Sequence, residues 1–313
     1  MAFLAAQPTV SGQSRHGRRP AWRKHLPAYL FLLPNFVGVL VFIAFPVCFA
    51  LYMSLQEWDG VTVPRFVGLG NFQALLGDNV FWYAVRNTFA YTLLSVPLGT
   101  AVGLGAALLL YQRVRGLSIF RAAMFVPVVT SALAIAVIWK WIYDYDNGLI
   151  NDALSLLNIH QIPWLSDPTW ALLGLTIIGV WQGFGLTAVI LLAALEGVPE
   201  SLLEAASIDG AGPWSRFWSI RIPLIAPALI FVTVNSFISS FQVFAQAYYM
   251  TGGGPDYGTT VLNFLVYQRA FQQNRFGEAS ALAYIQFGII FVVTIAQMRA
   301  SRRVVNAAAE FEV

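Results

Sequence analysis

The chain has 313 residues, of which 58% are hydrophobic and only 11% are charged. Soluble domains carry about a quarter charged residues, so this composition excludes an ordinary soluble enzyme. The net charge of +3 does not indicate nucleic-acid binding, because the basic residues lie beside apolar runs rather than on a polar, aromatic-interleaved face. The single cysteine, Cys48, lies inside an apolar run, which predicts neither an intrachain disulfide nor a metal-ligand cluster.

A basic tail over residues 1–28 precedes the first apolar stretch, as it would in a secretory signal. The stretch runs from Tyr29 to Leu55, about twice the length of a signal-peptide core, and no small-residue cleavage site follows it. We therefore expect a retained first membrane span.

Six apolar segments have the length of about 20 residues that a helix needs to cross the bilayer. The sequence predicts an all-α integral membrane protein, with a transmembrane domain over 29–298 and a C-terminal tail over 299–313. Polar residues interrupt the fifth segment and should face protein or water there. The expected spans are Tyr29–Leu55, Asn87–Tyr111, Ile119–Tyr143, Trp170–Leu195, Pro227–Tyr249 and Ala279–Gln297.

Basic residues predict the orientation, because short cytoplasmic loops carry an excess of Lys and Arg. With six spans and the N-terminus inside, thirteen of them lie on the inner side, among them Arg113 and Arg115, and five lie outside. Both termini are therefore expected on the cytoplasmic side of the membrane. The outer five are Arg65, Arg86, Lys140, Arg269 and Arg275.

The cytoplasmic connection over 196–223 is too long for a tight turn. Pro199-Glu200-Ser201 is typical of a helix start, and the stretch to Ile208 favours helix. Gly210, Gly212 and Pro213 should end that helix before a second short one over Trp214–Ile220. Two short helices and a glycine turn are expected on this side of the membrane.

Within this connection the chain reads Glu204-Ala205-Ala206, three residues, Gly210, nine residues, then Ile220-Arg221-Ile222-Pro223. The string resembles the EAA loop by which permease subunits of ATP-binding-cassette importers couple to their ATPase, with Ile222 where Leu is usual. The resemblance implies that the contact involves Glu204, Ala205, Ala206, Asp209, Gly210 and Ala211. An amphipathic interfacial helix is the alternative, but such a helix would carry more Lys and Arg.

A second resemblance narrows the class to carbohydrate importers of the maltose type. It rests on Trp164-Leu165-Ser166-Asp167-Pro168, Thr251-Gly252-Gly253-Gly254-Pro255, and Phe271, Gly277 and Ala279-Ser280-Ala281. The chain lacks the extra N-terminal spans and large outer insertion of the maltose permease itself. The implied partners are a second homologous permease, two copies of an ATPase carrying ATP and Mg, an extracytoplasmic solute-binding protein and the lipid bilayer. The implied location is the bacterial plasma (inner) membrane. No cofactor is expected on this chain.

By the same resemblance, a substrate path would include Gln182, Gly183 and Leu186 on the fourth span and Ser236, Ser239 and Ser240 on the fifth. These serines and Val243 also share the i, i+3, i+4, i+7 face of one helix. Val243 and Ser239 depart from the maltose branch, which leaves the particular sugar open. Simple interhelical packing is the alternative role for the serines.

The residues present argue against two other classes of function, a secondary transporter and an enzyme. An ion-coupled secondary transporter usually has ionisable residues inside its spans, and none of the six cores contains Asp, Glu or His. The sequence contains no helix-borne HExxH motif and no paired intramembrane carboxylates, which would indicate an enzyme. It also contains no GxxxxGK[ST] loop, which would indicate nucleotide binding. The solute remains open between a sugar and a compound such as a glycerophosphodiester.

Overall fold

The computed structural model describes the backbone of residues 21–112 and 117–309, with side chains over 29–112 and 119–301. Residues 1–20 and 310–313 of the expected tails, and the inner residues Arg113 and Arg115, lie outside this part of the chain. The chain forms two units, the first ending at Ala50 and the second beginning at Leu51.

The first unit is helical wherever it is described. Helix α1 (Ala21–Val39) continues through a π-helical segment, η1 (Leu40–Ala44), into α2 (Phe45–Ser54). Its apolar part, Tyr29–Ser54, has a mean hydropathy of 2.5 over its most apolar window and is long enough to cross a bilayer. The helix ends at Ser54, one residue before the end of the first expected span.

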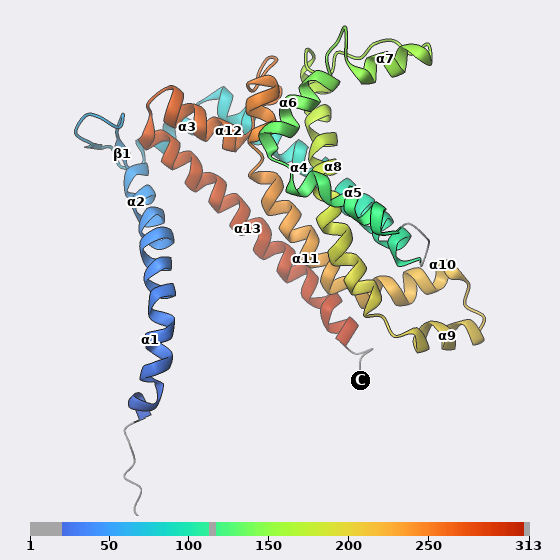
Figure 1. Cartoon of the computed structure of the whole chain (residues 1–313). Coiled ribbons are helices and arrows are strands. Elements are labelled where there is room, and N and C mark those ends of the chain that lie inside the picture. The colour runs from blue at the N-terminus through green and yellow to red at the C-terminus, as the bar shows by residue number, and fades with distance from the viewer. Residues whose placement is uncertain (1–20, 113–116, 310–313) are drawn as a thin grey trace, which may run out of the picture. The chain divides into compact units, whose positions relative to one another are not determined.

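Four more helices of the second unit are long and apolar enough to span a membrane. They are α4 (Asn79–Tyr111), α8 (Pro168–Glu196), the continuous stretch Pro213–Phe241, and α13 (Phe276–Ala309). Figure 1 shows α4, α8, α11 and α13 running through the unit, with α9 at one end and α3, α12 and the start of α13 at the other. Helices α4 and α8 are the most extensively packed pair.

The third expected span is not one straight helix, which corrects the sequence prediction. It consists of α5 (Leu117–Val129) and α6 (Ala132–Ile142), bent by 101° between them. Pro127 lacks a backbone N–H and weakens the end of α5, and the Thr130 hydroxyl donates to the Val126 carbonyl oxygen (2.5 Å). The described residues therefore contain five helices that are long and apolar enough to cross a membrane, or six candidate spans if this bent pair counts as one.

The second short helix expected after the glycine turn is instead the beginning of the fifth span. Helix α10 (Pro213–Arg216) continues through η2 (Phe217–Arg221) into α11 (Ile222–Phe241). In the π turn the Ile222 N–H bonds to the Phe217 carbonyl oxygen, so the helix passes Pro223 without ending. The span also ends earlier than expected, at Phe241 rather than Tyr249, and helix resumes at Ala245 and leads into η3 (Ala247–Thr251).

Short elements cover the end of the second unit opposite α9. They are strands β1 (Gln56–Glu57) and β2 (Arg65–Phe66), paired antiparallel, and α3 (Gly70–Leu76), α7 (Leu149–Leu156), α12 (Leu262–Tyr267) and η4 (Gln268–Gln272). The turn between the strands is organised by the Asp59 carboxylate. It accepts the N–H groups of Thr62 (2.7 Å) and Val61 (3.0 Å) and the Thr62 hydroxyl (2.7 Å), which lower the pKa of Asp59 to about 2.

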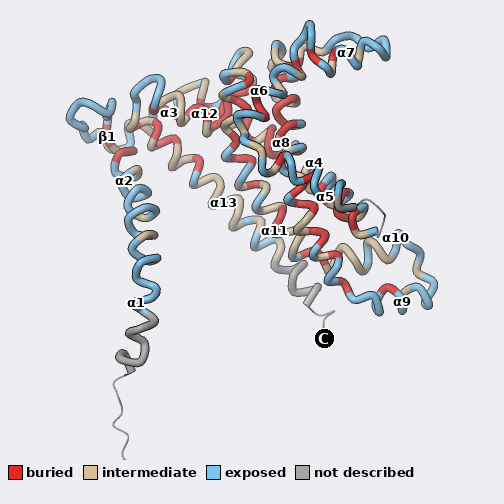
Figure 2. The backbone as a smooth tube through the Cα atoms, in the orientation of Figure 1, coloured by how far each residue is buried: buried red, intermediate tan, exposed pale blue. Residues whose placement is uncertain are grey.

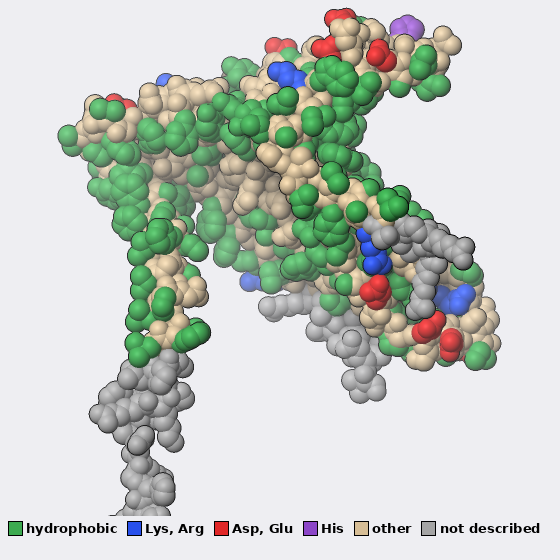
Figure 3. All heavy atoms as spheres, in the orientation of Figure 1, with side chains coloured by type: hydrophobic (Ala, Val, Ile, Leu, Met, Phe, Trp, Pro, Cys, Tyr) green, Lys and Arg blue, Asp and Glu red, His purple; other side chains and the backbone are tan. Residues whose placement is uncertain are grey.

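The core of the second unit lies where its long helices meet, and buried positions follow their inner faces (Figure 2). Small residues allow α4 and α8 to approach closely: a Cβ on Gly103 of α4 would lie 2.5 Å from the Thr187 methyl carbon of α8. On the face seen in Figure 3, charged side chains gather towards the two ends, near α7 and near α9, with hydrophobic side chains between them. That distribution fits a segment surrounded by lipid.

Candidate functional site

A cavity of about 440 Å³ lies among α4, α8, α11 and the break that follows α11. Its walls are mainly apolar, with hydroxyl and amide side chains placed among them, as is typical of small-molecule sites. The lining consists of Tyr91, Ser95, Val96, Gly99, Ala132, Gly179, Val180, Gln182, Gly183, Thr187, Ser236, Ser239, Ser240, Gln242, Val243, Phe244, Ala245 and Gln246.

Five of the six residues expected on a substrate path lie together in this lining: Gln182, Gly183, Ser236, Ser239 and Ser240. Leu186 does not, and its side chain is 44% exposed. The next residue, Thr187, lines the cavity instead, because consecutive positions on a helix point about 100° apart. Whether these residues touch a solute stays a prediction, but the structure brings them to one place.

The three serines of α11 differ in their surroundings. Ser240 is buried, donates to the Phe237 carbonyl oxygen (2.8 Å), and has its Oγ 3.0 Å from Thr92 Oγ1 of α4. Ser239 is exposed to the cavity and Ser236 is half-buried. Ser240 therefore serves the packing of α11 on α4, whereas Ser239 and Ser236 are free to meet a ligand.

The break after α11 places Gln242 and Gln246 in the cavity lining, and side chains from α12 and α13 bond to the carbonyl oxygens at the end of α11. The Phe241 carbonyl oxygen accepts from Gln286 Nε2 (2.9 Å) and the Gln242 carbonyl oxygen accepts from Asn263 Nδ2 (3.0 Å). Interrupted helices are tolerated at membrane depth where they are buried in protein or line a cavity, and they commonly form solute sites. The sequence predicts only that the polar run of the fifth span faces protein or water, and it places the end of that span at Tyr249, beyond the break.

Other lining residues come from α4 and were missed because an apolar span with scattered small residues gives no signal of its own. The Ser95 hydroxyl is buried at the cavity wall without a hydrogen-bond partner in the described chain. Tyr91 packs on Gly179 of α8 so closely that a Cβ there would lie 2.1 Å from the phenol oxygen. Across the site, Gln246 Nε2 donates to Gln182 Oε1 (2.9 Å) and joins the segment after the break to α8.

The chemistry of the lining is polar but uncharged. Tyrosine is the sole ionisable type among its members, and Asp, Glu, His, Lys and Arg are absent from them. Hydroxyl and amide groups can exchange hydrogen bonds with a polyhydroxylated solute, and the rings of Tyr91 and Phe244 offer apolar faces. Among the described residues no group of three His, Cys, Asp or Glu side chains is placed to hold a metal ion.

The connection between α8 and α11 has the first short helix and the glycine turn that the sequence predicts. Helix α9 (Glu200–Ile208) ends in a Schellman motif, in which the Ala211 N–H bonds to the Ala206 carbonyl oxygen (2.8 Å) and the Gly210 N–H to that of Ser207 (3.2 Å). Gly210 has a φ of +81°, a left-handed conformation that favours glycine. No neighbouring atom would touch a Cβ there, so the requirement for glycine comes from the backbone alone.

The side chains around this turn lie at the surface of the protein. Glu204, Ala205, Asp209 and Gly210 are exposed, and Ala206 and Ala211 are half-buried. In the described part of the chain the two carboxylates have no hydrogen-bond or ion-pair partner. Large apolar side chains are exposed beside them, at Leu202, Ile208, Trp214 and Trp218.

A bundle of membrane-length helices around an uncharged polar cavity, with a structured loop at one end, defines a membrane transport subunit. Residues 95–308 match the family described as the binding-protein-dependent transport system inner membrane component, and the chain belongs to that family. It is a permease subunit of the inner membrane and not itself an enzyme.

Relatives with similar sequences agree with this assignment, and a solved structure shares the fold. The chain is 35% identical to the trehalose/maltose transport system permease protein MalF of Thermococcus litoralis, over 90% of this chain and 95% of the relative. It is 36% identical to a probable ABC transporter permease protein of Bacillus subtilis (89% and 91%) and 32% identical to the lactose transport system permease protein of Rhizobium radiobacter (88% and 93%). A bacterial alginate ABC transporter solved with a pentasaccharide-bound periplasmic protein shares the fold, with a TM-score of 0.79 at 22% identity, covering 90% of this chain and 96% of that one.

Proposed function

We propose that the chain forms half of the translocation path for an uncharged sugar or sugar-like solute, in an importer that receives the solute from an extracytoplasmic binding protein. The observation that carries the proposal is the 440 Å³ cavity, which gathers amide and hydroxyl side chains beside two aromatic rings without a charged group. The names of relatives that transport trehalose, maltose and lactose support the same solute class.

The lining also separates the proposal from its alternatives. A glycerophosphodiester carries a negative charge, and desolvating that charge without a cation nearby is costly. This chain supplies no Lys or Arg to the cavity wall. An ion-coupled transporter would require an ionisable relay at the same depth, and the lining contains no carboxylate or imidazole.

Coupling to ATP is assigned to the loop around α9. Its exposed apolar side chains, with Glu204 and Asp209 between them, make a surface suited to an ATPase subunit that carries ATP and Mg. A second homologous permease and two copies of that ATPase complete the assembly, and both termini lie on the ATPase side. Closure of the ATPase pair would move α9 and bias α11, which begins within the same connection.

Transport by the assembled complex tests the proposal. The chain is purified with its partner permease, ATPase and binding protein, reconstituted into liposomes, and supplied with ATP and labelled maltose, trehalose, lactose or glycerophosphocholine. We expect uptake of at least one neutral sugar, reduced by Ser239→Leu at unchanged complex abundance. Uptake of glycerophosphocholine alone, or of sugar without ATP under an ion gradient, would overturn the proposal.

A further inference from the structure

A second cavity, of about 240 Å³, lies at the end of the second unit opposite α9. It is bounded by the first turns of α4, the start of α8 and the loop that follows η3. Its lining consists of Tyr83, Arg86, Asn87, Ala90, Leu94, Pro168, Thr169, Leu172, Leu173, Asp256, Tyr257 and Gly258. None of these residues takes part in the central cavity.

Along α4 and α8 the residues that line this cavity change from polar at the start of each helix to apolar further along it. On α4 the lining residues share one face at i, i+3, i+4, i+7 and i+11, beginning with Tyr83 and Arg86 and ending with Leu94. On α8 the same order holds, from Thr169 at the start to Leu172 and Leu173 one turn later. Tyrosine and arginine at the outer boundary above leucines match the change from headgroup to acyl chain in a bilayer.

Two opposite charges stand at the rim of this cavity. Arg86 and Asp256 are both exposed, and neither forms an ion pair with the other or with any other described residue. A guanidinium on the outer part of a membrane-length helix favours an anionic partner at the level of the headgroups. Asp256 adds a site for a cationic group beside it.

The wall that carries Asp256 is held in place before any ligand binds. Buried Asn87 donates through Nδ2 to the carbonyl oxygens of Tyr257 (2.6 Å) and Thr260 (3.0 Å). The Tyr257 ring stacks on that of Tyr83, with centroids 6.0 Å apart. Asp256 (φ +46°) and Tyr257 (φ +57°) are left-handed, a strained backbone that persists only where surrounding contacts enforce it.

We propose that this cavity binds a phospholipid whose headgroup carries both a phosphate and a primary ammonium, as in phosphatidylethanolamine. The phosphate accepts hydrogen bonds from Arg86 and the ammonium donates to Asp256, while an acyl chain lies over Leu94 and Leu173. A free phosphate would make no contact with Leu94 and Leu173, and a purely anionic headgroup would leave Asp256 without a cation. The inference goes beyond solute import and does not depend on it.

The test is lipid retention by the assembled complex, measured by native mass spectrometry after purification from membranes containing both phosphatidylethanolamine and phosphatidylglycerol. Arg86→Gln should retain about tenfold less phosphatidylethanolamine, because a charge-assisted bond to phosphate is lost. Asp256→Asn should keep lipid but lose the preference for phosphatidylethanolamine. Arg65→Gln, an exposed arginine on β2, is the matched control and should retain as much as the unmodified complex.

Equal retention in the Arg86→Gln and unmodified complexes would overturn the proposal, as would equal losses in Arg86→Gln and Arg65→Gln. Competition distinguishes a lipid from a free anion. Inorganic phosphate and glycerophosphoethanolamine, which lack acyl chains, should fail to displace the bound lipid at millimolar concentration. Displacement by either would assign the site to a soluble phosphate compound instead.

Discussion

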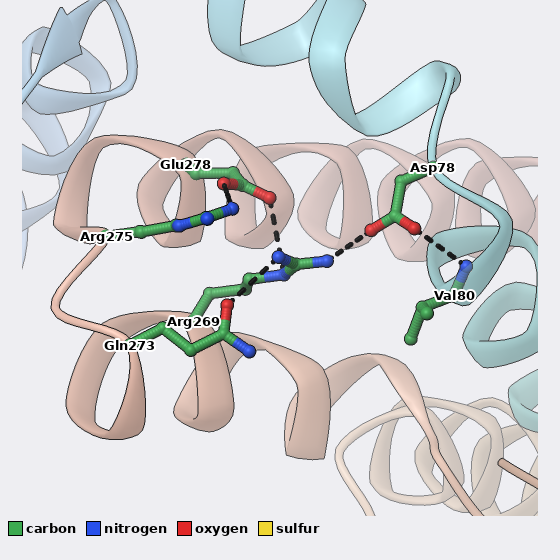
Figure 4. Close-up of polar contacts among 6 residues, drawn as sticks. All are labelled: Asp78, Val80, Arg269, Gln273, Arg275 and Glu278. Atoms are coloured by element: carbon green, nitrogen blue, oxygen red, sulfur yellow. Dashed lines mark hydrogen bonds and ion pairs between the residues drawn. The ribbon is translucent and has the colours of Figure 1, made fainter.

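Arg269 reaches Asp78, the residue that caps the N-terminus of α4, across 191 positions of sequence (Figure 4). Asp78 Oδ1 accepts the Val80 N–H (2.9 Å), and its other oxygen pairs with the guanidinium. The same guanidinium donates to Gln273 (3.0 Å) and lies 3.3 Å from Glu278 in the first turn of α13. One side chain therefore ties the starts of two membrane-length helices to η4.

This arrangement predicts a large difference between two neighbouring arginines. The Arg269 side chain is 11% exposed, and Arg269→Leu leaves the carboxylates of Asp78 and Glu278 without their shared cation, so we expect a loss of about 2–4 kcal/mol in stability. Arg275, which also pairs with Glu278, is 59% exposed, and Arg275→Leu should cost about 0–1 kcal/mol. Thermal unfolding of the purified complex in detergent measures both. Equal midpoints for the two variants would show that the buried network contributes little.

Hydropathy and turn residues predicted much of the helical structure correctly, because both signals depend on the local sequence. The expected fourth span, Trp170–Leu195, lies inside α8 and starts two residues after it and ends one residue before it, because a long apolar run is a local signal. The turn expected at Gly210 after a short helix is also present. The bend between α5 and α6 could not be predicted, since Thr130-Ser131 lies inside a run whose composition suits one straight helix. Tyr91 and Ser95 were missed for a different reason: they become cavity residues only when α4 packs beside α8 and α11.

The two serine environments on α11 predict separate effects. Ser239→Leu places a bulky apolar group in the cavity, where Ser239 is exposed, and should reduce solute affinity or transport rate without changing complex abundance. Ser240→Ala removes the contact with Thr92 and should cost about 0.5–1.5 kcal/mol in stability while leaving solute preference unchanged. Uptake assays and thermal unfolding of both variants separate the roles. A change of solute preference in Ser240→Ala, with none in Ser239→Leu, would reverse the assignment.

The close contact of Gly179 with Tyr91 predicts a double-variant rescue. In Gly179→Ala the new Cβ would lie 2.1 Å from the phenol oxygen, so the ring must shift and the cavity wall with it. We expect reduced uptake from Gly179→Ala and partial recovery from Gly179→Ala combined with Tyr91→Phe, because the nearest remaining ring atom would then be 3.1 Å away. Recovery is measured against Tyr91→Phe alone. A double variant no better than Gly179→Ala would place the defect outside this contact.

The turn at Gly210 gives the sharpest test of coupling. At φ +81° a valine is strained by about 1–3 kcal/mol, enough to change a conformational equilibrium roughly ten- to a hundredfold without unfolding the spans. Gly210→Val should therefore abolish most ATP-driven uptake while membrane insertion and abundance stay near normal. Gly210→Asn is the matched control, because asparagine tolerates the left-handed region, and it should retain most activity. Glu204→Gln removes one exposed charge and should lose little, about 0–1 kcal/mol of any contact with the ATPase.

Uptake, ATP hydrolysis and retention of the ATPase subunit are measured for all three variants. Full coupled uptake by the Gly210→Val complex would show that the turn does not transmit the ATPase motion, and equal loss in Gly210→Asn would show that side-chain bulk rather than backbone strain disturbs the loop.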